Sequence, residues 1–362
     1  MQIKNGYLVL YYCFDLGNEI LLDKIEKILG KKPVELQLTC RRLTPDYLQY
    51  RVPPLQIKLG VKNIKLKDEQ IKVEVDSKIY DFGVVSIRFW IPLQGGISDL
   101  RKTSIKFVEN KELENEARKE MEKIKGELKE AIMQPLHKEF LETYAVFQIV
   151  EFDKETTMKK LLKDHSMDIA SALIGEEKTV SDQELRDAIK NPLSYYPNDL
   201  VIIDWNASFL YDPGFGYDVL DVLEHAVIQL LELRTYDEYL DKTLDETYDD
   251  MDSFKGWYNL IAPYEKKLES LSEVRLDVVE VIEKVENSLK LIGDLYLAKV
   301  YAGASQRFYL DKWKESVNSK LDTLMTTYTM LTTKVEFRRN FILEVTIVAL
   351  FVLDIALLLL GK

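Results

Sequence analysis

The segment Phe341–Leu360, close to the C-terminus, is the most constraining feature of this sequence. It reads FILEVTIVALFVLDIALLLL, and fifteen of its twenty residues are Leu, Ile, Val or Phe. At about 1.5 Å per residue, a helix of this length reaches roughly 30 Å, the thickness of the hydrocarbon core of a bilayer. The segment therefore predicts one transmembrane helix, and its position is typical of a tail-anchored, single-pass membrane protein.

Two acidic residues, Glu344 and Asp354, lie inside this segment. An aspartate at mid-bilayer costs about 2.5–3.5 kcal/mol, whereas each large apolar residue contributes about 0.3 to 0.6 kcal/mol in favour of insertion, so insertion still wins. Ten residues of helix place the two acids roughly 80° apart. Because charges inside a span usually face protein or water, we expect helix association through polar contacts. A small ion or proton path and a protonated pair near an interface are the alternatives.

The basic residues around the segment predict its orientation. Lys334, Arg338 and Arg339 precede it, and only Lys362 follows. Because cytoplasmic flanks carry the excess of Lys and Arg, we expect the N-terminal body on the cytoplasmic side, most simply of a prokaryotic inner membrane.

The rest of the chain has a globular composition, with 30% charged and 46% hydrophobic residues. Its net charge of −12 argues against a dedicated nucleic-acid-binding protein, which needs a clustered basic surface. The two cysteines, Cys13 and Cys40, show no metal-ligand or redox spacing, and we expect buried free thiols.

The pattern of elements predicts an α+β N-terminal portion, then long coiled-coil-like helices, then the transmembrane helix. The expected parts are an α+β domain over 1–97, a mixed α/β segment packing on it over 98–215, a helical region over 216–340 and the anchor over 341–360. Alternating or apolar runs predict strands over 7–14, 56–59, 71–75, 84–90, 144–152, 200–205 and 207–211. Helices are expected over 18–29, 98–134, 156–174 and 182–189.

The helix expected over 98–134 is charged but carries an apolar stripe. The stripe keeps the 3/4 spacing of one buried face: Leu113, Ala117, Met121, Ile124, Leu128 and Ile132. A second helix, over 217–239, is apolar nearly all round and is therefore predicted to be a core element. Its polar residues must then find partners or solvent: Glu224, His225, Gln229, Glu232 and Arg234.

No proline occurs between Pro263 and the C-terminus, which favours long helices. Two sets of residues follow heptad spacing and predict a coiled-coil seam that pairs helices within or between subunits. The first begins with Val274, Val278, Val281 and Val285; the second comprises Val317, Leu321, Leu324, Tyr328, Leu331 and Val335. The seam is interrupted at Tyr301–Gln306, where we expect a break or a hairpin turn near Gly303.

Sequence motifs for catalysis were sought in the whole chain. It contains no GxxxxGK[ST] loop, no GxGxxG and no GxSxG. Its three histidines have no second ligand at a spacing typical of metal sites. We therefore predict no catalytic residue, no cofactor and no metal site.

The C-terminal third resembles a family of membrane-anchored proteins named for meiotic nuclear division in yeast (Rmd-type). The residues that carry the resemblance are Arg338–Arg339, Leu343–Glu344 and Leu353–Asp354–Ile355, with Tyr301, Arg307, Trp313 and Lys320–Leu324 upstream and Phe82–Val85 with Phe89–Trp90 near the N-terminus. The resemblance implies an oligomeric, membrane-anchored protein without known catalysis; mitochondrial members are linked to organelle translation.

The leading hypothesis is a non-enzymatic, oligomeric scaffold or interaction module whose partners are the lipid bilayer and further copies of itself. One alternative is a divalent-cation-handling protein similar to the CorA-type transporters, which also place long helices before a C-terminal membrane segment. Those proteins carry two spans and a Gly-Met-Asn tripeptide, which this chain lacks. A further alternative is an enzyme of unknown class with a pocket near Asp204–Trp205–Asn206.

Overall fold

The structure is a computed structural model that describes residues 1–28, 48–50, 52–66, 69–253, 275–276, 278–280, 282–283, 289–291 and 295–360. The chain divides into two compact units. Unit 1 comprises Met1–Thr235 and Val281–Trp313, and unit 2 comprises Tyr236–Glu280 and Lys314–Lys362. Three of the predicted seam residues, Val274, Val281 and Val285, lie outside the described residues.

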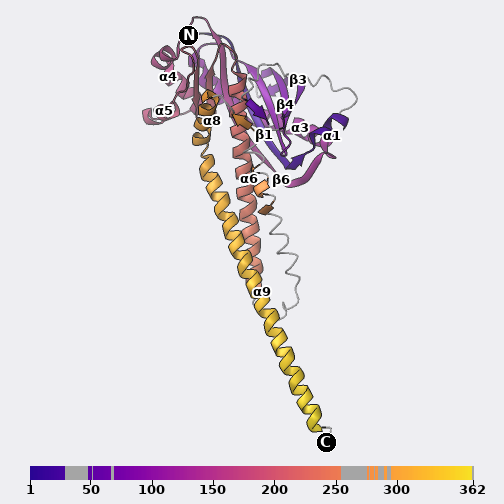
Figure 1. Ribbon diagram of the computed structural model, residues 1–362. Helices are drawn as coiled ribbons and strands as arrows, with labels where there is room; N and C mark the ends of the chain where they lie inside the picture. The colour runs from indigo at the N-terminus through magenta and orange to yellow at the C-terminus, as the bar shows by residue number, and fades with distance from the viewer. Residues whose placement is uncertain are drawn as a thin grey trace. The chain divides into compact units, whose positions relative to one another are not determined.

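Unit 1 is built on a seven-stranded sheet with the order β3-β4-β5-β1-β6-β8-β7 (Figure 1). Its strands are β1 (Ile3–Ile20), β3 (Leu55–Leu66), β4 (Glu69–Ile79), β5 (Val84–Pro92), β6 (Ile132–Phe152), β7 (Leu200–Ile203) and β8 (Ala207–Tyr211). All neighbours are antiparallel except β6 and β8, which are parallel. The short strands β2 (Leu48–Tyr50) and β9 (Leu289–Leu291) form a separate antiparallel pair.

One glycine fixes the turn between β4 and β5 against β1. Gly83 has φ +100°, and a Cβ atom there would lie 1.6 Å from the carbonyl oxygen of Gly17. Only glycine tolerates both the left-handed backbone and this close approach. The turn therefore holds the strand end where β1 and β6 shift register between Asp15 and Gly17.

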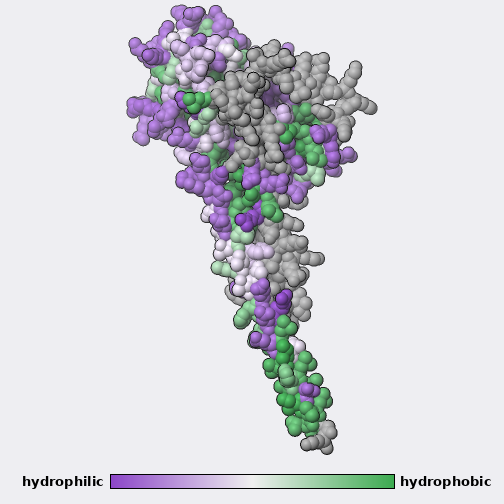
Figure 2. Space-filling view, in the orientation of Figure 1, coloured by the Kyte–Doolittle hydropathy of each residue, from purple (hydrophilic) through white to green (hydrophobic). Residues whose placement is uncertain are grey.

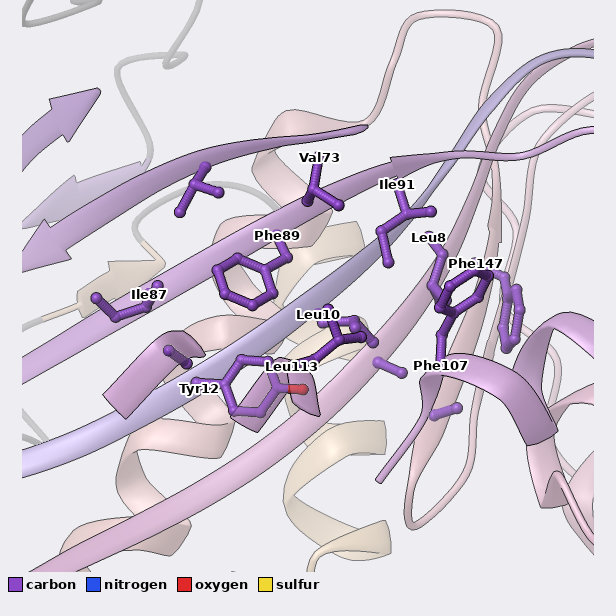
Figure 3. Close-up of a cluster of buried hydrophobic side chains, with 14 of the residues drawn as sticks. Leu8, Leu10, Tyr12, Val73, Ile87, Phe89, Ile91, Phe107, Leu113 and Phe147 are labelled. Atoms are coloured by element: carbon purple, nitrogen blue, oxygen red, sulfur yellow. The ribbon is translucent and has the colours of Figure 1, made fainter. Parts of the chain in front are cut away.

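One face of the sheet carries the apolar core. Alternate residues of β1 point toward it, among them Leu8, Leu10 and Tyr12, and Figure 3 shows them gathered with Phe89 and Phe147. This face is covered by α2 (Leu100–Phe107), α3 (Lys111–Leu128) and α4 (Met158–Ile174), beside which lies α5 (Asp182–Ala188). The short helix α1 (Leu22–Ile28) follows β1.

The predicted apolar stripe is confirmed for five of its six residues; Ile132 lies in β6 and is half-buried, and the single helix over 98–134 is wrong. Leu113, Ala117, Met121, Ile124 and Leu128 are all buried on α3. The helix is interrupted because Glu109 has φ +56° and the Asn110 side chain accepts a hydrogen bond from the Leu113 N–H, which caps a new helix. After α3 the chain enters β6, where long pairing with β1 overrides the helical pattern and accommodates Pro135 opposite the register shift.

Helix α6 (Tyr217–Ser253) lies on the opposite face of the sheet. Its residues 222–233 are all buried, polar ones included, which confirms the expected core helix. The phenolic hydroxyl of Tyr11 in β1 donates to the carbonyl of Leu220 at 3.2 Å, which ties the start of α6 to the middle of the sheet.

The helix break predicted at Tyr301–Gln306 is not found there. Helix α8 (Leu295–Arg307) runs through these residues, and the break comes at Phe308–Tyr309, where Tyr309 has φ +54° before α9 (Leu310–Leu360) begins. Gly303 does not end the helix. A Cβ atom on Gly303 would lie 3.5 Å from the side chains of Leu193 and Ile203, so this glycine sits where α8 packs closely on β7.

In unit 2 the second half of α6 runs beside α9 (Figure 1). The ammonium of Lys320 lies 2.8 Å from Asp237 and 2.6 Å from Asp241, and Ser316 donates to Asp237 at 2.7 Å. Among the described residues of this unit, the buried hydrophobic ones are Tyr236, Leu240, Leu244, Val278, Val317, Leu321 and Leu324. Part of the predicted seam is therefore buried within one chain. Tyr328 is half-buried, and the side chains of Leu331 and Val335 are not among those that the structure describes. The coiled coil stays a prediction.

Candidate functional site

The face of the sheet that α6 covers is polar, which is unusual for a buried surface. We define the polar face as the side chains of β1, β4, β5 and β6 that point toward α6: Tyr11, Cys13, Asp15, Asp76, Lys78, Ser86, Arg88 and Glu142. They alternate along their strands with the residues of the apolar core, and strand pairing brings Arg88 beside both Tyr11 and Asp76.

Lys78 and Arg88 hold the acidic residues of α6 against this face. The Lys78 ammonium lies 2.5 Å from Asp221 and 2.8 Å from Glu224. The Arg88 guanidinium lies 2.5 Å from Asp76 and 3.5 Å from Glu224. Asp221 and Glu224 are one helical turn apart, so both reach the same two cations. The result is an ionic network that joins β4, β5 and α6.

The network is compensated electrostatically. Burial alone would raise the pKa of Glu224, but Lys78 and Arg88 outweigh it and hold that pKa below its usual value. Burial opposes the charged form of Arg88, and the neighbouring carboxylates of Asp76 and Glu224 nevertheless raise its pKa. These groups stay ionised at neutral pH. Since two desolvated charges must be paired to be tolerated, the network favours one placement of α6 on the sheet.

Aromatic side chains border the network at the start of α6. Trp90 donates its indole N–H to Asp76 at 3.0 Å, and the Arg88 guanidinium lies 5.6 Å from the centre of the Trp90 ring. Phe215, in the turn before α6, stacks on Tyr217 at 4.1 Å between ring centres and adopts φ +79°. Such a backbone conformation is strained for a bulky residue. The Gln148 side-chain amide donates a hydrogen bond to the Phe215 carbonyl and so helps to hold this turn in position.

The opposite side of α6 faces α8. The Tyr301 hydroxyl lies 2.5 Å from the Gln229 side chain, and the His225 ring is 6.4 Å from the Tyr301 ring. Burial lowers the pKa of His225 to about 4, so this histidine is neutral at pH 7. At the solvent edge, Arg234 lies 2.5 Å from Glu142 and over the Trp313 ring. Gln229 and Arg234 thus have the partners that the sequence required, and so does Glu224.

Asp204 and Trp205, from the segment where the alternative pocket was predicted, make contacts within unit 1. The Arg307 guanidinium in α8 donates to the Asp204 carboxylate, with its Nε 2.7 Å away. Tyr144 donates to the Asp204 carbonyl at 2.9 Å. Trp205 lies 6.0 Å from Tyr309 between ring centres. These contacts tie α8 to the β7–β8 turn.

The predicted membrane residues lie on α9. All residues from Phe341 to Leu360 are exposed, and Figure 2 shows a hydrophobic surface at this end of the helix. Within the described parts of the chain, α9 is the one helix long and apolar enough to cross a membrane; its most apolar window has a mean hydropathy of 2.6 and is not buried at all. Glu344 and Asp354 are exposed in it, and Arg338 and Arg339 precede it.

Among the described residues, no group of three or more His, Cys, Asp or Glu side chains converges as a metal site would. The buried network was missed from sequence because charges alternating with apolar residues in Glu69–Ile79 look like a solvated strand face. The signal that could have found it is that α6 itself is too apolar to lie on a surface, so a second buried layer must cover the sheet.

Comparison with known proteins identifies the family of this chain. The family described as "Uncharacterized protein MJ0711, N-terminal domain" matches residues 5–218, which is more than half of the chain. The chain belongs to this family. The residues matched to the MJ0711 family begin within β1, include the other six strands of the unit 1 sheet and end at the start of α6.

The MJ0711 family also includes a relative of similar length. The "Uncharacterized protein MJ0711" of Methanocaldococcus jannaschii is 27% identical over 255 residues, which cover 69% of this chain and 77% of that protein. No solved structure matches the chain.

Membership of the MJ0711 family overturns the resemblance to the meiotic-nuclear-division family, which was wrong. That resemblance rested mainly on residues 301–355, where basic residues precede an apolar run, a pattern that many membrane-type helices share. The Gly-Val-Val match near the N-terminus has a local cause. Gly83 is required by the β4–β5 turn, and two valines begin the buried strand β5.

Proposed function

We propose that this chain is a single-pass membrane protein whose unit 1 is a non-enzymatic interaction module, anchored by residues 341–360 and self-associating through them. The observation that carries the proposal is the exposure of twenty consecutive residues at the end of α9, of which fifteen are large and apolar. Soluble proteins rarely expose apolar patches larger than a few hundred Å² unless another surface covers them.

Lipid is the cover that best fits this segment. Twenty helical residues match the roughly 30 Å hydrocarbon core, and helical hydrogen bonding satisfies the backbone there. The hydroxyl of Thr346 donates to the Ile342 carbonyl at 2.7 Å, so this polar side chain needs no further partner in lipid. The remaining costs are the carboxyls of Glu344 and Asp354.

The flanking charges favour a cytoplasmic location for unit 1. Lys334, Arg338 and Arg339 lie within the last two turns before the apolar segment, where the positive-inside rule applies most strongly.

Self-association is supported by the two acids. A carboxyl in lipid is stabilised by a polar partner, and a second copy of the same helix provides one at the same depth. Glu344 and Asp354 lie roughly 80° apart around the helix, so a single packed face with neighbouring copies can include both.

Carbonate extraction of membranes that contain the full-length protein tests the anchor. Wild type is expected in the pellet. The double substitution Val348→Lys/Leu350→Lys adds two charges at mid-span, each costing about 2.5–3.5 kcal/mol on insertion scales, and is expected to move the protein to the supernatant. The matched control, Met330→Lys/Thr333→Lys, places the same charges on exposed positions of α9 before the span and is expected to stay in the pellet. Wild type in the supernatant would overturn the proposal.

A further inference from the structure

Three buried oxygen atoms without a hydrogen-bond partner lie where β1 faces α6. They are Asp15 Oδ2, Glu232 Oε1 and Thr235 Oγ1. The three residues are 2%, 2% and 1% exposed. Glu232 interacts electrostatically with Asp15, and the Thr235 hydroxyl lies beside the same carboxyl group. Two carboxyls and a hydroxyl thus converge on one small region between the strand and the helix.

This acid pair differs from the other buried acids of the same interface. Asp76 is paired with Arg88, Glu224 with Lys78, and Glu142 with Arg234. No Lys or Arg of the described residues forms an ion pair with Asp15 or Glu232. The Asp15 carboxyl accepts a hydrogen bond from the Gly17 N–H at 3.2 Å and interacts with the Thr235 hydroxyl, both of which are neutral groups. The protein provides a cation for each of the other acids but none for these two.

Burial without a counter-charge is costly for a carboxylate, and two such groups side by side also repel each other. A bound cation removes both costs at once. The available donors are oxygens only, with up to two negative charges, which is the donor set preferred by hard divalent cations and not by zinc or copper. Thr235 adds a neutral oxygen next to the acids, which a pair that only shared a proton would not require.

We propose that Asp15, Glu232 and Thr235 form a binding site for one hard divalent cation, of the Mg²⁺, Ca²⁺ or Mn²⁺ class. The ion is held by one carboxyl from β1 and by a carboxyl and a hydroxyl from α6. It fastens the end of the unit 1 part of α6 to the sheet, as Lys78 fastens the beginning. Its role is structural, since the ligands are buried and no substrate path is needed.

The test uses full-length protein in detergent at pH 8, stripped with EDTA and then given Mg²⁺, Ca²⁺ or Mn²⁺ separately at millimolar concentration. Thermal unfolding and metal content after gel filtration are both measured. At about a hundred times its dissociation constant, one ion is expected to raise the Tm by roughly 5–10 °C, with about one ion retained per chain. This experiment does not depend on the membrane anchor.

Variants assign the effect to the site. Asp15→Asn/Glu232→Gln is expected to lose both the metal-dependent Tm shift and the retained ion, while Thr235→Val reduces the shift and Thr235→Ser keeps it. Glu151→Gln, at an exposed acid paired with Lys4, is the control and keeps the full shift. The proposal is overturned if wild type retains no ion, or if the double variant shows the same metal-dependent shift. If wild type retains no ion, Asp15 and Glu232 are stabilised by a bound proton and not by a metal ion.

Discussion

Lys78 and Glu224 lie 2.8 Å apart across the interface between β4 and α6, and their side chains are 6% and 0% exposed. They are separated by 146 residues of sequence, so neither strand nor helix alone reveals that its charge has a partner. This pair and its neighbours make the second face of the sheet an ionic surface, whereas the first face is an ordinary apolar core. Four predictions for the folded protein follow from this arrangement and from the turns around it.

Removing one partner of the buried pair is expected to cost stability. Lys78→Met leaves Glu224 and Asp221 short of a cation, and breaking a buried pair in this way typically costs about 3–5 kcal/mol. Because Arg88 still reaches Glu224, we expect the lower end of that range in urea unfolding. Lys4→Met removes an exposed ion pair with Glu151 and is expected to change stability by less than about 0.5 kcal/mol. Equal losses in both variants would contradict the buried network.

Asp15 is expected to contribute a fall in the free energy of unfolding, measured in EDTA, as the pH rises from about 4 to 7. Burial raises the pKa of Asp15 from 3.8 to about 7, so the folded state binds a proton that the unfolded state has already lost. Glu232 adds a fall of the same sign, because burial and the neighbouring Asp15 raise its pKa as well. Asp15→Asn carries no titrating carboxyl at this position and should therefore make the fall shallower without abolishing it. An unchanged slope in the variant, measured by urea unfolding at several pH values, would refute the assignment to Asp15.

His225 is expected to contribute a slope of the opposite sign. Burial lowers its pKa from 6.5 to about 4, so the unfolded state binds the proton first as the pH falls. The stability associated with neutral His225 is therefore present above pH 6.5 and is lost by roughly 3 kcal/mol as the pH falls toward 4. His225→Leu should remove this loss, so that the variant is relatively more stable at pH 4.5 than at pH 7.5. The measurement is the free energy of unfolding of the variant minus that of wild type, compared at the two pH values. An equal difference at both pH values would contradict a neutral buried His225.

Substitution of two glycines by alanine is expected to have opposite effects on stability. Gly83→Ala forces a Cβ atom onto the Gly17 carbonyl at φ +100°, and we expect a loss of at least about 3 kcal/mol or a failure to fold. Gly126 lies at an exposed position in the middle of α3, with nothing within 4 Å of an added Cβ atom. Gly126→Ala should therefore stabilise the folded protein by about 0.5–1 kcal/mol. If Gly83→Ala unfolds at the wild-type urea concentration, the β4–β5 turn is not built as described.

The acids of the apolar segment are expected to control self-association. Glu344→Leu/Asp354→Leu removes both polar groups and should make the span more apolar while weakening helix pairing. In detergent, light scattering after gel filtration is expected to show a larger particle for wild type than for the variant. Glu336→Leu, an exposed acid just before the segment, is the control. A wild-type monomer, or an assembly unchanged in the double variant, would contradict association through these carboxyls.

The sequence predicted those parts of the fold whose signal is local. The apolar stripe of α3 and the all-round apolar character of α6 reflect periodicity within one helix, and both are buried as expected. The exposed apolar end of α9 likewise follows from composition over twenty residues. The limits of β6 did not follow, because its first half is held by pairing with β1, more than a hundred residues earlier.

The candidate site could not be predicted for the same reason. The charges of β4 alternate with apolar residues, as they would on a strand exposed on one side, and only the cover of α6 turns that face into an interior. The supposed break at Gly303 was wrong because a glycine can mark close packing as well as a turn. In both cases the deciding contact lies between elements far apart in the chain.

The end of α9 is proposed to lie in lipid. This proposal is tested most directly by a spin label at Leu350→Cys, in full-length Cys13→Ser/Cys40→Ser protein reconstituted into liposomes. Collision with oxygen, which concentrates in the bilayer, is compared with collision with a water-soluble nickel complex. We expect strong oxygen and negligible nickel accessibility at 350, and the reverse at a Met330→Cys control. Nickel accessibility at 350 equal to that at 330 would contradict it.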